Sequence, residues 1–120
     1  MRKVLIAEDD ESTRDLLKII VAGAGFQVET VEDGEKALRA IKADPPDLII
    51  LDIMLPEVHG FSICRQVKSD ETLKGIKILM LSAKSFQADR RQAEEVGADA
   101  FLAKPVNPLE LIQKVKTLLA

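Results

Sequence analysis

The sequence has no tryptophan or tyrosine and only one cysteine, Cys64. With four phenylalanines it has little to stack on bases or sugars, which disfavours a carbohydrate or single-stranded nucleic-acid platform. A single cysteine cannot form an internal disulfide and suits a reducing cytosol. Apolar runs are short: residues 4–7 cannot form the core of a signal peptide, and no later run approaches a membrane span. We therefore expect a soluble cytoplasmic protein that makes no membrane contact.

Charge of neither sign is in large excess. The chain of 120 residues has 17 basic and 20 acidic side chains, a formal net charge of -3. A protein that coats nucleic-acid phosphates needs a clustered basic face, so direct binding to nucleic acid is not expected. The length suits one domain that buries roughly two-thirds of the surface exposed by its unfolded chain. We treat residues 1–120 as one domain.

Short apolar runs alternate with helical patterns five times along the chain. The predicted strands cover residues 3–7, 26–31, 48–52, 76–81 and 100–103. Residues 48–51 are continuously apolar, as in a central strand buried on both faces, whereas polar residues at 27 and 29 suit a sheet edge. The alternation predicts a doubly wound, flavodoxin-like α/β fold: a parallel sheet in the order 2-1-3-4-5 with helices on both faces.

The helical patterns carry recognisable caps and apolar stripes. The first helix is predicted to begin at Asp10 or Ser12 and to end at Gly25, and the last has Asn107 as its N-cap followed by Pro108. The residues expected to face inward are Leu16, Leu17, Ile20, Val21 and Ala24 in the first helix, Phe86, Arg90, Ala93 and Val96 in the fourth, and Leu109, Ile112, Val115 and Leu119 in the fifth.

Charged and polar side chains stand where four of the predicted strands end. They are Glu8, Asp9 and Asp10 after the first strand, Asp52 at the end of the third, Ser82 after the fourth and Lys104 after the fifth. In an open parallel sheet the ligand crevice lies beyond the carboxyl ends of the strands, where the strand order reverses. The predicted order therefore places Glu8, Asp9 and Asp52 in one crevice.

This crevice favours phosphoryl chemistry with a divalent cation. Carboxylates without a histidine or cysteine nearby in sequence form a hard-oxygen site suited to Mg²⁺, which would offset their mutual repulsion. The carboxylate of Asp52 is the natural nucleophile because it can form an acyl phosphate. Ser82 offers a hydroxyl and Lys104 a cation to the phosphoryl oxygens that the metal does not reach.

Each of these residues also has a purely structural interpretation. An acidic run at the start of a helix commonly caps it, and we expect Asp10 to be the cap. Taken singly, Asp52 fits a solvated acid, Ser82 a turn residue and Lys104 a surface lysine. Their common position at one edge of the sheet favours a shared site.

The order and spacing of these residues resemble the receiver domains of response regulators in two-component signalling, of the chemotaxis-regulator type. That family has an acidic pair after strand one, an Asp after strand three followed by a Pro and a Gly, Ser or Thr with Ala after strand four, and Lys-Pro after strand five. The matching residues are Glu8-Asp9, Asp52 with Pro56 and Gly60, Ser82-Ala83, and Lys104-Pro105. The resemblance covers the whole chain.

The resemblance implies a phospho-accepting protein. Asp52 would take a phosphoryl group from the phosphohistidine of a histidine kinase or a phosphotransfer protein. The protein would not be an enzyme in the usual sense, because it would catalyse only its own phosphorylation and dephosphorylation. The implied Mg²⁺ ligands are Asp9, Asp52 and the backbone carbonyl of Met54, with Glu8 acting through a water molecule.

The resemblance also implies a conformational switch. Ser82 would move toward the phosphoryl group, and Phe101, at the position of the family's switch aromatic, would swing into the vacated space. The face made by the fourth helix, fifth strand and fifth helix would then change. There we expect the partner, which is a downstream effector protein, an output domain of a longer protein, or a second copy on phosphorylation. A cis bond between Lys104 and Pro105 is implied too.

Some residues depart from the commonest family pattern. Glu8 stands where Asp is usual, and Phe101 lacks the hydroxyl of the frequent Tyr. Met54 and Lys84 occupy positions where the family tunes its rate of dephosphorylation. His59 replaces an acid and is expected to be a solvated loop residue without chemistry.

Three other functions fit parts of the pattern. A phosphatase of the haloacid dehalogenase type also uses a strand-end Asp with Mg²⁺, but it needs a second acid two residues on, where Met54 stands. A flavodoxin-like cofactor carrier needs hydroxyl and glycine residues after the first strand, whereas three acids there would repel phosphate. An unphosphorylated interaction module is disfavoured by the intact set of acids, serine and lysine.

Overall fold

The computed structural model describes residues 2–83 and 87–120, so the expectations for Lys84 and Phe86 lie outside the described residues. The strands are β1 (Lys3–Ala7), β2 (Gln27–Val31), β3 (Leu48–Asp52), β4 (Lys77–Ser82) and β5 (Ala100–Ala103). The helices are α1 (Glu11–Gly23), α2 (Gly34–Ala43), α3 (Gly60–Ser69), α4 (Gln87–Glu95) and α5 (Pro108–Leu118). All strand pairs are parallel and the sheet order is β2-β1-β3-β4-β5, which confirms the prediction.

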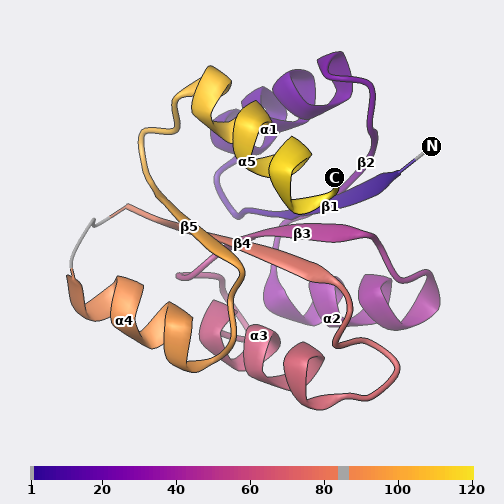
Figure 1. Ribbon diagram of the computed structural model, residues 1–120, viewed down its shortest axis with the longest axis vertical. Coiled ribbons are helices and arrows are strands. Elements are labelled where there is room, and N and C mark those ends of the chain that lie inside the picture. Colours follow the sequence, from indigo (N-terminus) through magenta and orange to yellow (C-terminus); the bar gives the residue numbers. More distant parts are fainter. Residues whose placement is uncertain (1, 84–86) are drawn as a thin grey trace.

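The sheet separates two apolar layers (Figure 1). Helices α1 and α5 cover one face, while α2, α3 and α4 cover the other. Strand β3 is buried along its whole length, and its alternate residues serve the two layers: Ile50 packs with α1 and α5, and Leu51 with the opposite helices. A central parallel strand is covered on both sides, which explains its uninterrupted apolar sequence.

Local capping fixes where the helices begin. Asp10 is the N-cap of α1 and accepts a hydrogen bond from the backbone N–H of Thr13, which settles the choice between Asp10 and Ser12. Asn107 caps α5 as predicted. Gly25 after α1 and Gly97 after α4 have φ of 98° and 91°, a backbone region that favours glycine.

Three of the predicted inward-facing residues point to solvent instead. Leu109 is 75% exposed, Leu16 is 52% exposed and Arg90 on α4 is exposed too, so these three expectations were wrong. In α5 the buried stripe runs through Leu111 and Val115, and Leu109 lies about 200° around the helix from Leu111. In α1 the stripe is Leu17 and Val21, and Leu16 lies beside it on the outer face. No helix in the described part of the chain is long and apolar enough to cross a bilayer.

Candidate functional site

The carboxyl ends of the central strands are held level by backbone hydrogen bonds. The N–H of Ile53 donates to the carbonyl of Leu81 at 3.0 Å, and the N–H of Lys104 donates to the carbonyl of Ser82 at 2.7 Å. Residues that follow β3, β4 and β5 are therefore neighbours in space. The bond between Lys104 and Pro105 is cis, as the family resemblance implies.

At this edge Lys104 forms ion pairs with two buried acids. Its Nζ atom lies 2.5 Å from Oε1 of Glu8 and 3.0 Å from Oδ2 of Asp52. Glu8 is 0% exposed and Asp52 is 4% exposed, whereas the side chain of Lys104 reaches solvent. Glu8 after β1, Asp52 at the end of β3 and Lys104 after β5 are distant in sequence and thus meet in one pit, as the strand order predicted.

Burial and neighbouring charges shift the pKa values of two groups in the pit, Glu8 and Lys104. Desolvation raises the pKa of Glu8 to about 7, although the ion pair with Lys104 and a hydrogen bond from the backbone N–H of Asp10 both oppose it. Burial alone would lower the pKa of Lys104, but the contacts with Glu8 and Asp52 outweigh it and raise the pKa above its ordinary value. Lys104 therefore stays cationic near neutral pH, while Glu8 can carry a proton there.

The donor set fits a hard divalent cation. Glu8, Asp9 and Asp52 each present a carboxylate oxygen, and these oxygens all lie within 4.8 Å of one another. Oε1 of Glu8 is buried and accepts no hydrogen bond of normal geometry from the described residues, despite its ion pair with Lys104. Three clustered carboxylates with one ammonium group retain excess negative charge, and oxygen donors of this kind suit Mg²⁺. The site could hold that ion.

The loop after β3 packs tightly behind Asp52. The N–H of Met54 donates to Oδ1 of Asp52 at 3.0 Å, which orients the carboxylate. A Cβ atom on Gly60 would lie 2.5 Å from the carbonyl oxygen of Asp52 and 2.8 Å from Cα of Ile53, so only glycine fits there. Gly60, the glycine that the family pattern has after the strand-end Asp, therefore lets α3 begin in contact with the backbone of Asp52 and Ile53.

Ser82 is buried at the end of β4, and its hydroxyl faces α4. Its Oγ donates to Oδ2 of Asp89 at 2.8 Å, and Ser82 is 3% exposed. The structure thus places Ser82 beside the pit through its backbone bond to Lys104, with its side chain bonded to a helix that the sequence had not connected to it.

Sequence reasoning missed Arg14, Asp89 and the capping role of His59. Nη1 of Arg14 donates to the backbone carbonyls of Glu8 at 3.0 Å and Asp9 at 3.3 Å. These hydrogen bonds connect α1 to the loop that carries the acids. His59 is exposed as expected, but its Nδ1 accepts from the N–H of Phe61 and caps α3. The position of Arg14 one turn into a helix that follows three acids was the available signal for its role.

Comparisons with a family model, with curated proteins and with solved structures all point to the same family. Residues 4–116 match the response regulator receiver domain. Transcriptional regulatory protein GltR of Pseudomonas aeruginosa is 42% identical over 118 residues, which are 98% of this chain and 49% of GltR. The solved structure of the chemotaxis response regulator CheY4 of Vibrio cholerae is 32% identical with a TM-score of 0.91, and the match covers 98% of each chain.

The chain belongs to the response regulator receiver domain family. It is a receiver domain of two-component signalling, a signalling protein and not an enzyme in the usual sense, and it spans about half the length of the curated relatives it matches. This membership decides against the phosphatase and flavodoxin alternatives. The receiver domain of sensor histidine kinase PA1611 from P. aeruginosa is 27% identical with a TM-score of 0.90, over 98% of this chain and 97% of that one. Its solved structure has a magnesium ion coordinated in the active site cleft.

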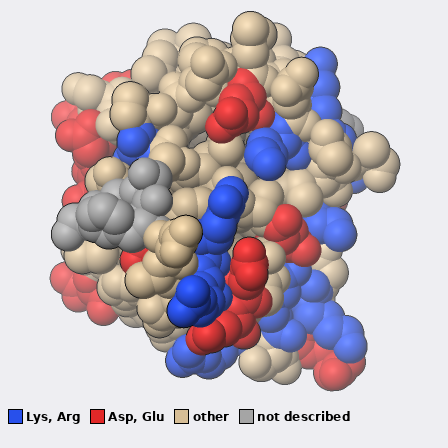
Figure 2. All heavy atoms as spheres, turned by 60° about the vertical axis from the view of Figure 1, so that its left-hand side comes forward, with Lys and Arg blue, Asp and Glu red and all other residues tan. Residues whose placement is uncertain are grey.

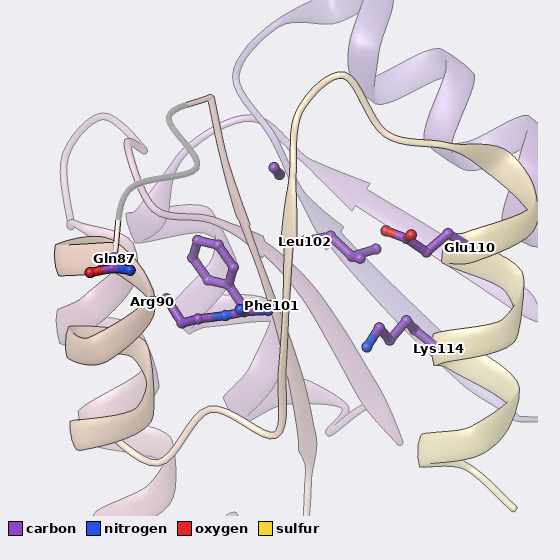
Figure 3. Close-up of a pocket in the computed structure, with 7 residues that line it drawn as sticks. Gln87, Arg90, Phe101, Leu102, Glu110 and Lys114 are labelled. Atoms are coloured by element: carbon purple, nitrogen blue, oxygen red, sulfur yellow. The ribbon is translucent and has the colours of Figure 1, made fainter.

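The receiver's expected switch residue, Phe101, lies on β5 against α4 (Figure 3). Its ring is half-buried, and the guanidinium carbon of Arg90 lies 5.8 Å from the ring centroid. A cavity of about 340 Å³ opens beside it, between α4 and α5, and Glu110 and Lys114 line its far side. The face that the sequence assigned to partners thus contains a hollow next to Phe101.

Charges of both signs are interspersed over this side of the receiver (Figure 2). Lysine and arginine side chains lie next to aspartate and glutamate side chains, so neither sign dominates the described part of the face in view. Binding to a phosphate backbone requires clustered positive charge. The surface in Figure 2 does not have that pattern.

Proposed function

We propose that this receiver accepts a phosphoryl group on Asp52 from the phosphohistidine of a histidine kinase or a phosphotransfer protein. The proposal is carried by one observation: the buried carboxylate of Asp52 lies 3.0 Å from the ammonium group of Lys104 and within a cluster of three acids. We propose Asp9, Asp52 and the backbone carbonyl of Met54 as Mg²⁺ ligands, with Glu8 acting through water.

In the transfer step a carboxylate oxygen of Asp52 attacks phosphorus. The new P–O bond forms as the P–N bond to the donor histidine breaks, and the electron pair of that bond returns to the imidazole. Lys104, which forms an ion pair with Asp52, would neutralise a phosphoryl oxygen, and the hydrogen bond from the Met54 N–H would keep the carboxylate oriented. When bound, Mg²⁺ would supply charge neutralisation at the remaining phosphoryl oxygens and between the acids.

Phosphorylation would then act as a switch. It adds roughly two negative charges and three acceptor oxygens to the pit, and Ser82 would turn toward them. Phe101 would move inward and alter the face made by α4, β5 and α5. A nearly complete switch requires about 5.5 kcal/mol of preference for the active state, which a few charge-assisted hydrogen bonds can supply.

Output would pass through that face to an effector protein, an output domain or a second phosphorylated copy, in the cytosol. The name of GltR describes a transcriptional regulator, and this chain spans 49% of GltR. We propose that the receiver itself makes no direct contact with nucleic acid, and that any DNA contact would be made by another part of a longer protein. The interspersed charges in Figure 2 support the absence of direct contact between the receiver and nucleic acid.

Intact-protein mass spectrometry after incubation with Mg²⁺ and acetyl phosphate tests the phosphorylation step. We expect one phosphoryl adduct, lost in Asp52→Asn and when Mg²⁺ is removed with EDTA. Asp15→Asn is the matched control, because Asp15 is an exposed acid on α1 and should keep the adduct. Failure of the wild-type protein to form an adduct at any donor concentration would favour an unphosphorylated interaction module.

A further inference from the structure

We propose that Asp89 is a positioning residue for Ser82, and that it holds the Ser82 hydroxyl toward α4 until a phosphoryl group on Asp52 competes for it. This inference rests on the proposed function and deepens it. It connects the pit to the first turn of α4 through one hydrogen bond, without passing through Phe101.

The contact has the character of a strong restraint. Oγ of Ser82 donates to Oδ2 of Asp89 at 2.8 Å, and Ser82 is 3% exposed while Asp89 is half-buried. Hydrogen bonds to an ionised acceptor are roughly twice as strong as neutral ones. No Lys or Arg among the described residues lies within ion-pair distance of Asp89, so none of them neutralises the carboxylate that receives the hydroxyl.

The Ser82 hydroxyl can donate its hydrogen bond either to Asp89 or to a phosphoryl oxygen, but not to both. A serine hydroxyl has one proton to donate, so it cannot serve Asp89 and a phosphoryl oxygen with that proton at the same time. Turning to the phosphoryl group therefore removes the Ser82 donor from Asp89. Because Asp89 lies in the first turn of α4, the exchange removes one hydrogen bond between the start of that helix and the end of β4.

The exchange predicts that Asp89 weakens binding of a phosphoryl group or its analogue. The apparent dissociation constant rises in inverse proportion to the fraction of molecules in which Ser82 is available. Removing the acceptor in Asp89→Ala should therefore tighten binding of beryllofluoride, a phosphoryl analogue, by about threefold to tenfold in the presence of Mg²⁺. Asp89→Asn keeps an acceptor oxygen without the charge, so it should shift affinity in the same direction by less.

The test is a double-mutant cycle read by ¹⁹F NMR titration of beryllofluoride with saturating Mg²⁺. In a Ser82→Ala background, Asp89→Ala should change affinity by less than about twofold, because the hydroxyl it restrains is gone. Glu94→Ala, which removes an exposed acid from the same helix, should match the wild-type protein. A merely structural role of Asp89 would leave its effect intact in the Ser82→Ala background.

The outcomes separate the two proposals. If the wild-type protein binds beryllofluoride and both Asp89 variants bind it equally well or more weakly, the positioning role is overturned while the proposed function stands. Persistence of the Asp89→Ala effect in the Ser82→Ala background overturns it as well. If the wild-type protein binds no beryllofluoride, the proposed function fails, and this inference fails with it. Asp89→Asn provides the same comparison if Asp89→Ala does not fold.

Discussion

Replacing Lys104 by methionine would leave the acids of the pit without their ammonium partner. Methionine is close to lysine in length, so Lys104→Met mainly removes the charge. The ammonium lies 2.5 Å from Oε1 of Glu8 and 3.0 Å from Oδ2 of Asp52, and the cluster also includes Asp9. After the substitution three carboxylates would face one another with oxygens within 4.8 Å. Their repulsion should destabilise the folded state.

The size of this destabilisation depends on how deeply the ion pairs of Lys104 are buried and on whether Glu8 can take up a proton. Removing one partner of a buried ion pair costs about 3–5 kcal/mol. Two features reduce that cost here: the side chain of Lys104 is 20% exposed, and the pKa of Glu8 is already about 7, so Glu8 can take up a proton. We expect the free energy of unfolding to fall by about 2–3 kcal/mol at pH 8 in EDTA, and by less at pH 6.

Magnesium should reverse much of this loss. A ligand present at a hundred times its dissociation constant stabilises the folded state by about 2.7 kcal/mol. Without the competing ammonium, Lys104→Met should also bind Mg²⁺ more tightly than the wild-type protein does. Urea unfolding followed by far-ultraviolet circular dichroism, with EDTA or Mg²⁺ at pH 6 and pH 8, measures both effects.

A matched control isolates the pit. Lys18→Met removes an exposed lysine of α1 and should stay within about 0.5 kcal/mol of the wild-type protein under every condition. If Lys104→Met in EDTA is as stable as the wild-type protein, the acids do not repel one another as the geometry indicates. If Mg²⁺ does not stabilise the variant, the acids do not bind the ion.

Three further substitutions test separate parts of the site. Between the ordinary pKa of 4.5 and about 7, folded Glu8 keeps a proton that the unfolded chain has released, so the free energy of unfolding should fall as pH rises through this window in EDTA. In the wild-type protein this fall should be on the order of 2 kcal/mol, and Glu8→Gln should reduce it in urea titrations. If the free energy of unfolding falls equally with pH in both proteins, the raised pKa does not belong to Glu8. Gly60→Ala should cost about 1–3 kcal/mol in the same unfolding assay because its Cβ meets backbone, whereas Gly75→Ala, with nothing within 4 Å, should be nearly neutral. Arg14→Ala should weaken Mg²⁺ binding by about threefold in an NMR titration, and Arg65→Ala should not; equal affinities would remove Arg14 from the support of the acidic loop.

The strand order and the pit were predictable because they depend on short-range patterns. A polar residue lies at the end of each strand or directly after it, and parallel strands bring their carboxyl ends to one edge, so the strand order predicts that Glu8, Asp52 and Lys104 lie near one another. N-caps such as Asp10 and Asn107 are equally local. The structure brings Glu8, Asp9, Asp52 and Lys104 together, and the roles that the family resemblance implies for them stay predictions.

Contacts that depend on rotation about a helix axis were not predictable in this way. Leu109 and Leu111 are equally apolar, and only the packing of α5 on the sheet selects Leu111 for the core. The bonds of Arg14 to Glu8 and of Asp89 to Ser82 likewise depend on where helices lie relative to strand ends. Periodicity identifies a helix and its stripe, but it leaves such side-chain partners open.

A crystal structure of the receiver with Mg²⁺ and beryllofluoride tests the central claim most directly. We predict beryllium bonded to a carboxylate oxygen of Asp52, with the metal on Asp9, Asp52 and the Met54 carbonyl. The ammonium of Lys104 should contact a fluorine, and the Ser82 hydroxyl should have left Asp89 for another fluorine. Beryllofluoride bound away from Asp52, or Mg²⁺ held without that carboxylate, would contradict the account.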